Sequence, residues 1–191
     1  MAERQLATSL SGIRNDHLAR YLWASERLGD SGHVIDAACG CGYGSSILAD
    51  RGFSVTAFDI APDAIGYARS RWDRRAMDWR VCELSSAEFT ASDAVVSFET
   101  IEHLADPRSF LAAARASAPR LIASVPNEDV IPFVRKRFPF HHRHYTVDEF
   151  AALLGECGWT ITKLFGQKDK FSEVFPDVCG RTIVVDAVRV E

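Results

Sequence analysis

Two kinds of hydrophobic pattern alternate along the chain. Short, nearly continuous apolar runs are typical of buried strands, and they occur at residues 33–38, 54–60, 77–84, 92–99, 120–126, 159–166 and 181–190. Between most of them lie longer segments whose apolar residues recur every three or four positions. This spacing predicts helices at residues 13–29, 42–52, 61–72, 106–118 and 146–158.

Strands that alternate with helices indicate an α/β fold. We expect a doubly wound, Rossmann-like sheet of seven strands, mostly parallel, with helices on both faces. No helical segment separates the runs at 159–166 and 181–190. These two strands should therefore pair antiparallel and give the sheet an antiparallel edge strand.

The length of 191 residues and the hydrophobic share of 47% fit a single domain spanning residues 1–191. Within it, residues 1–30 are predicted to carry a helix that caps the sheet. Residues 127–145 show no helical pattern and contain Pro132 and Pro139. We expect this segment to be a loop on the substrate side, where the variable walls of such folds lie.

The charge and the cysteines set limits on partners and location. The net charge of −4 argues against a nucleic-acid partner. No apolar run has the roughly 20 residues that a membrane span needs, and the first residues lack the pattern of a signal peptide. Five irregularly spaced cysteines favour reduced thiols and a cytoplasmic protein. The Cys39/Cys41 pair is interpreted as small residues of a tight loop rather than a metal site.

A glycine-rich stretch, VIDAACGCGYGSS from Val34, follows the first predicted strand. Its glycines, Gly40, Gly42 and Gly44, depart from the G-x-G-x-x-G pattern of dinucleotide sites. Asp36 would repel a pyrophosphate and favours a ligand with a positive charge. Asp59 ends the second strand, where a carboxylate can accept hydrogen bonds from ribose hydroxyls. Together these residues fit S-adenosylmethionine, an adenosine that carries an ammonium and a sulfonium.

Three stretches, VIDAACGCGYGSSILA, VTAFDIAPDAIGYAR and DAVVSFETIEHL, resemble in order the class I S-adenosylmethionine-dependent methyltransferases. The resemblance implies that Asp59 binds the ribose, that Ile60 packs on the adenine and that Asp36 and Gly40 lie near the methionine end. Glu83 would contact the adenine amino group, although VCELSS departs from the usual G-D-A. The implied cofactor-binding set is Asp36, Ala38, Gly40, Gly42, Tyr43, Asp59, Ile60, Glu83, Leu84 and Glu99.

A second group of chemically active residues follows the fourth strand. At helical spacing, Glu99, Glu102 and His103 share one face. Two carboxylates and an imidazole can ligate a divalent ion. Alternatively, His103 is a general base that a glutamate orients, or the segment merely caps a helix. These three interpretations stay open.

The loop at 127–145 is rich in cations. It holds Arg135, Lys136, Arg137, Arg143 and three histidines, His141, His142 and His144. Local positive charge on an acidic protein indicates an acceptor with an anionic part, such as a phosphate or a carboxylate.

The E-x-x-E-H segment followed by a later histidine resembles two groups of metal-assisted O-methyltransferases, which act in ubiquinone synthesis and on the ends of small RNAs. This resemblance implies that Glu99, Glu102, His103 and His141 hold Mg²⁺ or another divalent ion. His103, Glu102 and His141 would then be the catalytic residues. The stretches DHLARYLWA and ACGCGYGS also resemble methyltransferases of sugar and polysaccharide synthesis. His17, Arg20 and Tyr21 on the first helix could contact cofactor or acceptor, or simply pack on the core.

The sequence thus predicts a methyltransferase of class EC 2.1.1 that modifies a hydroxyl of a small acceptor, with sugar-like and anionic acceptors both open. An RNA 3′-terminal 2′-O-methyltransferase and a non-catalytic cofactor-binding subunit are the alternatives. The glycine spacing and Asp36 oppose a nicotinamide-dependent oxidoreductase.

Overall fold

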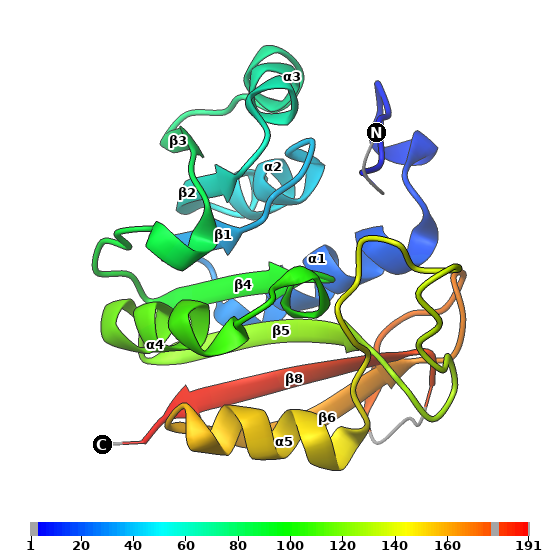
Figure 1. Cartoon of the computed structure of the whole chain (residues 1–191). Coiled ribbons are helices and arrows are strands. Elements are labelled where there is room, and N and C mark those ends of the chain that lie inside the picture. Colours follow the sequence, from blue (N-terminus) through cyan, green and yellow to red (C-terminus); the bar gives the residue numbers. More distant parts are fainter. Residues whose placement is uncertain (1–3, 177–179, 191) are drawn as a thin grey trace.

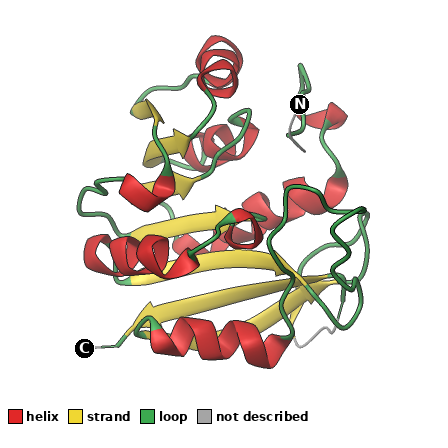
Figure 2. Cartoon of the chain, in the orientation of Figure 1, coloured by secondary structure: helices red, strands yellow, loops and turns green. Residues whose placement is uncertain are grey.

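A computed structural model describes residues 4–176 and 180–190. In order along the chain, its longer helices are α1 (Asn15–Leu28), α2 (Tyr43–Asp50), α3 (Pro62–Trp72), α4 (Pro107–Ser117) and α5 (Val147–Glu156). Its strands are β1 (Gly32–Ala37), β2 (Phe53–Asp59), β3 (Met77–Val81), β4 (Ala94–Phe98), β5 (Arg120–Pro126), β6 (Trp159–Gln167), β7 (Phe175–Pro176) and β8 (Thr182–Arg189). Three 3₁₀ turns complete the described part: η1 (Leu10–Gly12), η2 (Leu84–Ser86) and η3 (Ile101–His103). Strands and helices alternate through most of the chain, as predicted (Figure 2).

The strands form one mixed sheet in the order β3-β2-β1-β4-β5-β8-β6-β7. The pairs from β3 to β5 are all parallel. β8 runs antiparallel to both of its neighbours, β5 and β6. Two predictions are therefore corrected. The described part of the sheet has eight strands instead of seven, and its long antiparallel strand lies inside the sheet instead of at the edge.

The burial of the two C-terminal strands explains this order. β8 is buried from Thr182 to Ala187, so it needs a neighbour on each side. Over Trp159–Leu164, only Trp159 of β6 is buried and the other residues are exposed or partly exposed, which suits an outer strand. β7 adds two residues beyond it, pairing Phe175 and Pro176 with β6. A two-residue strand that contains proline has no readable hydrophobic period, so the pattern could not reveal it.

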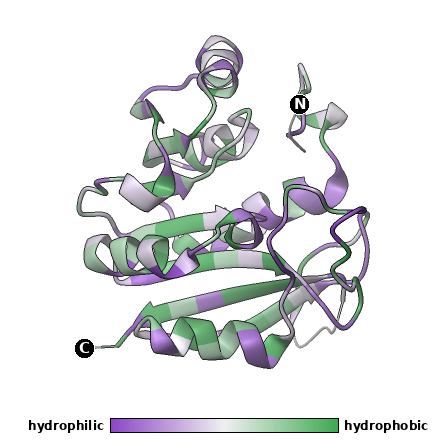
Figure 3. Ribbon diagram, viewed as in Figure 1, coloured by the Kyte–Doolittle hydropathy of each residue, from purple (hydrophilic) through white to green (hydrophobic). Residues whose placement is uncertain are grey.

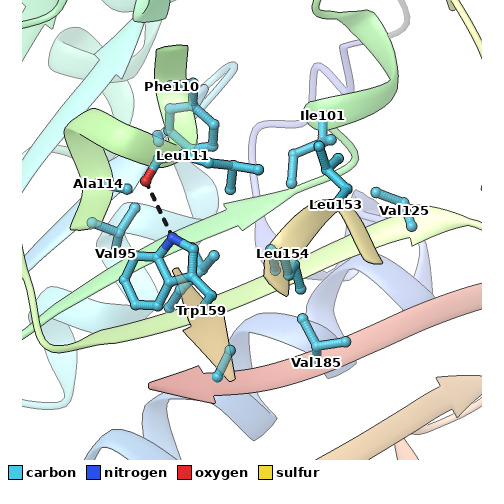
Figure 4. Packing of buried hydrophobic residues seen from close by; sticks show 14 of the residues in the cluster. Val95, Ile101, Phe110, Leu111, Ala114, Val125, Leu153, Leu154, Trp159 and Val185 are labelled. Atoms are coloured by element: carbon cyan, nitrogen blue, oxygen red, sulfur yellow. Dashed lines mark hydrogen bonds between the residues drawn. The ribbon is translucent and has the colours of Figure 1, made fainter. Parts of the chain in front are cut away.

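Helices cover both faces of the sheet (Figure 1). Neighbouring strand residues belong to different clusters: that of Val34 includes residues of α1, α2 and α3, whereas that of Ile35 includes residues of α4 and α5. In the second cluster the Trp159 indole nitrogen donates a hydrogen bond of 3.1 Å to the Leu111 carbonyl (Figure 4). Hydrophobic residues dominate the strands and alternate with polar ones on the helices (Figure 3). Of the described helices, none has the length and apolar character to cross a bilayer.

Local signals in the sequence account for several element ends. Pro62 begins α3, and Asp106 caps α4 by accepting from the Arg108 backbone N–H. Thr146 and Glu149 form the predicted capping box of α5. No helix forms between Asn127 and Tyr145, as predicted. This loop and the N-terminal segment lie on one side of the sheet, beyond the arrowheads of β4 and β5 (Figure 1).

Candidate active site

A large cavity opens at the carboxyl ends of the parallel strands. Its volume is about 670 Å³, in the range of sites that bind cofactors and small ligands. Residues that follow β1, β2, β4 and β5 line it, together with the N-terminal segment and the first turns of α1. Segments that are distant in sequence therefore meet where doubly wound sheets bind their ligands.

The glycine loop between β1 and α2 bends around one end of this cavity. Gly40 and Gly42 have positive φ angles of 57° and 87°, a conformation that suits glycine. A Cβ atom on Gly42 would lie 2.5 Å from the Cβ atom of Ala68 in α3. Only glycine allows this approach. Ala38, Gly40 and Tyr43 line the cavity, whereas Gly42 lies behind its wall.

Asp36 is fully buried beneath the loop instead of on the cavity wall. Its carboxylate accepts hydrogen bonds from the Tyr21 hydroxyl at 3.0 Å and the Ser45 hydroxyl at 2.6 Å. Burial raises the pKa of this carboxyl to about 6, although the bonds from Ser45 and Tyr21 lower it. Asp36 thereby ties α1 and α2 to the end of β1.

Asp59 lines the cavity at the end of β2 and organises the loop from the other side. It accepts hydrogen bonds of 2.9 Å from the backbone N–H groups of Gly40 and Ala61. Arg4 forms an ion pair with the same carboxylate, with Nη2 2.7 Å from Oδ1. Sequence reasoning missed Arg4, because nothing in its surroundings marks a partner 55 positions away.

Three further residues of the predicted cofactor-binding set line the cavity, of which Ile60 and Glu83 were expected at the adenine. Ile60 is 60% exposed there, which is unusual for a large apolar side chain in a cleft and leaves it available for a planar ring. Glu83 and Leu84 follow β3 and line the same cavity. The residues expected at the ribose and the adenine therefore all line this cavity.

Glu102, His103 and His141 lie together at another part of the cavity. Each offers one ligand atom, and these atoms all lie within 4.8 Å of one another. The Glu102 side chain is fully buried. Backbone contacts join the two segments: the His142 N–H donates to the Glu102 carbonyl at 2.7 Å, and the His103 Nδ1 lies 3.0 Å from the Phe140 carbonyl oxygen.

Glu99 is outside this cluster. It adopts a positive φ of 51°, and its carboxylate accepts a hydrogen bond of 3.2 Å from the Ser124 hydroxyl. The expectation of a shared helical face is corrected, because the helix here is a single 3₁₀ turn over Ile101–His103 that begins after Glu99. Three of the four predicted metal ligands therefore come together.

This cluster fits a divalent ion by the chemistry of its donors. One carboxylate and two imidazoles suit ions of intermediate softness such as Mn²⁺, Fe²⁺ or Zn²⁺. Mg²⁺ prefers oxygen ligands, so it fits the same three residues less well.

Comparisons with known proteins identify the family. Residues 6–164 match a family described as a methyltransferase domain. The chain belongs to the class I S-adenosylmethionine-dependent methyltransferases. The predicted cofactor, S-adenosylmethionine, is thereby confirmed, and the glycine loop as the place where it binds stays a prediction.

Two curated relatives illustrate the family. A Mycobacterium tuberculosis protein named probable S-adenosylmethionine-dependent methyltransferase is 33% identical over 141 residues, which is 70% of this chain and 50% of that protein. A ubiquinone biosynthesis O-methyltransferase of Xanthomonas oryzae is 38% identical over 111 residues, 55% of this chain and 44% of that enzyme. The chain spans about half the length of the curated relatives it matches.

Solved structures share the fold of this methyltransferase. Magnesium protoporphyrin IX methyltransferase of Synechocystis, with bound S-adenosylhomocysteine, has a TM-score of 0.70 at 20% identity, covering 91% of this chain and 80% of that one. A Burkholderia thailandensis 1,6-didemethyltoxoflavin-N1-methyltransferase also has a TM-score of 0.70 at 20% identity, covering 90% and 77% of the two chains.

The first helix of the methyltransferase supplies part of the cavity wall. His17, Arg20 and Tyr21 all line it. The His17 Nδ1 atom lies 3.0 Å from the Tyr43 hydroxyl. Burial, and secondarily the charge of Arg20, lower the pKa of His17 to about 3, so this imidazole is neutral at physiological pH.

The cations of the 127–145 loop were expected at the cavity, but none of them lines it. Arg135 donates to the His141 carbonyl at 2.9 Å, and Arg143 pairs with Glu149. The lining cations are instead Arg4, Arg14, Arg20, Lys170 and Arg181. Lys170 follows β6, and Arg181 directly precedes β8. β8 lies beside β5, a strand order that the sequence pattern did not reveal.

Proposed function

We propose that this protein transfers a methyl group from S-adenosylmethionine to a hydroxyl of a small acceptor. The main support for this proposal is the cluster of Glu102, His103 and His141, which lines the same cavity as the glycine loop and Asp59. The residues proposed to bind the donor and a group of proton-accepting or metal-binding side chains thus line one cavity. This supports transfer to an oxygen, because the donor and the group that removes the acceptor proton must be close together.

The chain's own residues have two tasks in this reaction. S-adenosylmethionine supplies an electrophilic methyl group on a sulfonium. Asp59 would bind the ribose, and Ile60 would pack on the adenine. Gly40 would let the backbone approach the methionine part closely. In such a displacement, the alignment of donor and acceptor supplies most of the rate enhancement. The main contribution of the strand ends would therefore be to hold the donor rigidly.

The second task is to remove the proton of the acceptor. A hydroxyl oxygen that gains a methyl group must lose its proton, and the imidazoles of His103 and His141 are the candidate bases in the cavity. In the metal-assisted form of the proposal, Glu102, His103 and His141 hold a divalent ion, which lowers the pKa of a hydroxyl that binds it. Glu102 would otherwise orient an imidazole that acts as base.

The acceptor side of the cavity favours a small molecule with an anionic group. Arg14 pairs with Asp16, and the Arg20 Nη1 donates to the Gln167 Oε1 at 2.6 Å. Lys170 and Arg181 line the cavity and form no ion pair with any described residue. An acceptor with a carboxylate or phosphate would find its counter-charges there. A sugar-like acceptor that carries a carboxylate or a phosphate also fits this proposal.

The remaining organisation follows the same proposal. We take residues 1–191 as one catalytic domain in which residues 1–30 form a cap and residues 127–145 form the acceptor-side loop. The cap supplies Arg14, His17 and Arg20 to the cavity, and the loop supplies Ile131, Phe138 and His141, which supports this division.

The test is a methyl-transfer assay with a panel of hydroxyl compounds in matched pairs, with and without a carboxylate or phosphate. Activity should be lost in Asp59→Ala and His141→Ala, and should fall when a chelator is added. Arg181→Gln should raise KM for the anionic member of each pair, whereas Arg135→Gln, outside the cavity, should not. Full activity of both a His103→Ala and a His141→Ala variant in excess chelator would overturn the metal and base roles together.

A further inference from the structure

His144 lies directly behind His141 and has no part in the reaction as proposed so far. It is 2% exposed, and its ring packs against Phe138 and Phe133 with centroid distances of 4.5 and 5.6 Å. Its Nδ1 atom is 2.6 Å from the Ile131 carbonyl oxygen, and its Nε2 atom is 2.8 Å from the Nδ1 atom of His141. A backbone carbonyl and two imidazoles thus form one hydrogen-bonded line.

The chemistry of these partners sets the direction of both bonds. A carbonyl oxygen only accepts, so the Nδ1 atom of His144 carries a proton and donates. The Glu128 carboxylate, 4.0 Å from the same nitrogen, also favours a proton there. A neutral imidazole has one N–H, so the Nε2 atom of His144 is an acceptor and the Nδ1 atom of His141 donates to it. Neutral His141 then has its lone pair on Nε2.

His103 is oriented in an analogous way by a different partner. Its Nδ1 atom lies 3.0 Å from the Phe140 carbonyl oxygen, which again only accepts. The two imidazoles of the cluster therefore have the same tautomer, one set by a backbone carbonyl and the other by a side chain. The side chain is the part that mutation can remove.

We propose that His144 is a positioning residue that holds His141 in the Nδ1–H tautomer and leaves the His141 Nε2 lone pair for a divalent ion or an acceptor proton. This inference rests on the role proposed for His141 above. The ligand or base nitrogen of a histidine is generally defined by the bond that its other nitrogen makes. In this chain the defining partner is the buried His144, whose own tautomer the Ile131 carbonyl fixes.

The tautomers can be read directly from long-range ¹H–¹⁵N spectra of the full ¹⁵N-labelled protein at pH 8, where an ordinary imidazole with a pKa of about 6.5 is neutral. We expect the Nδ1–H form for both His141 and His144. His144→Phe keeps the ring contacts but removes the acceptor, so His141 should shift toward the Nε2–H form. His144→Gln offers an amide oxygen at a similar reach and should restore the Nδ1–H form. His142→Gln changes an exposed neighbour and should leave both tautomers unchanged.

Calorimetric titration of Zn²⁺ into the same proteins gives an independent readout. His144→Phe should weaken Zn²⁺ binding about tenfold or more, which is the usual effect of losing such a supporting partner. His144→Gln should recover most of the affinity. The inference is overturned if wild-type His141 is the Nε2–H tautomer, or if His144→Phe leaves the His141 tautomer unchanged.

The two proposals fail in different ways. If the wild-type protein binds no Zn²⁺ but the tautomers respond to His144 as described, the metal-assisted form of the function fails and the positioning inference stands. If Zn²⁺ binds but His141 keeps its tautomer in every variant, the function stands and the inference fails. If His144→Phe does not fold, the wild-type and His144→Gln spectra alone decide, since both must have the Nδ1–H form.

Discussion

The ion pair between Arg4 and Asp59 leads to a prediction about cofactor affinity. Asp59 is the residue expected to accept the ribose hydroxyls, and its Oδ1 atom is 2.7 Å from the Arg4 Nη2 atom. The ribose and Arg4 therefore need the same oxygen atoms. The backbone bonds from Gly40 and Ala61 to Asp59 need not change, because a carboxylate has further lone pairs.

The magnitude follows from the exposure of the pair. The Arg4 side chain is 28% exposed and that of Asp59 is 5% exposed, so solvent screens the interaction in part. Exposed pairs contribute up to about 1 kcal/mol and charge-assisted hydrogen bonds about 1.5–3 kcal/mol. We take about 1 kcal/mol as the cost of displacing Arg4. Arg4→Gln should then bind S-adenosylmethionine about fivefold more tightly.

Calorimetric titration of S-adenosylmethionine at two salt concentrations checks this prediction. The gain should shrink as salt rises, because the wild-type ion pair is itself screened. Arg74→Gln is the matched control, since it removes an exposed pair with Asp50 and leaves Asp59 untouched. Weaker binding by Arg4→Gln would refute the reasoning and would mean that Arg4 helps to hold the bound cofactor.

Three further predictions concern stability. Gly44→Ala should destabilise the protein by about 1–3 kcal/mol in urea unfolding, because its Cβ atom would overlap the Tyr21 ring. Its contrast is Gly66→Ala, with open space around it in α3, which should stabilise by about 0.5–1 kcal/mol; equal effects of the two would contradict this. Trp159→Ala should cost about 3–5 kcal/mol by emptying a core site, and an effect below 1 kcal/mol would show that the core refills. The folded-state pKa of Asp36, about 6, lies above its unfolded value of 3.8, so the folded protein holds the extra proton and loses stability as pH rises from 4 to 6. Asp36→Asn should remove that loss, so an unchanged slope between pH 4 and 6 would argue against it.

Sequence reasoning placed a residue correctly where its position follows from the local hydrophobic pattern, and failed where it does not. The glycine loop and Asp59 could be placed because the loop follows β1 and Asp59 ends β2, two strands with strong apolar runs, and strand ends of a parallel sheet meet at one edge. Glu99 was grouped with Glu102 because helical spacing was assumed across a segment that makes only one 3₁₀ turn. Spacing alone does not show where a short turn begins.

Contacts between segments far apart in the chain could not be predicted from the sequence. The place of β8 depends on the burial of both its faces relative to β6, and this order brings Lys170 and Arg181 to the cavity. Charge on the 127–145 loop was visible in the sequence, but the direction of its side chains was not. Arg143 points to Glu149 of α5 because a partner is available there. The loop contributes Ile131, Phe138 and His141 to the cavity instead.

The two ends of the cavity are built differently, and this difference bears on how the acceptor is selected. The proposed donor end consists of strand ends and a glycine loop whose close approach to α3 tolerates little change. The proposed acceptor end is lined by Phe138 and His141 of the 127–145 loop and by Lys170 and Arg181, which lie outside the parallel strands. Loops of this kind accept substitution far better than the strands that carry them. Exchanging the side chains of Phe138, Lys170 or Arg181 should therefore change the preferred acceptor while leaving S-adenosylmethionine affinity near its original value. A parallel loss of cofactor binding in such variants would mean that the two ends are coupled and that the acceptor loops help to form the donor site.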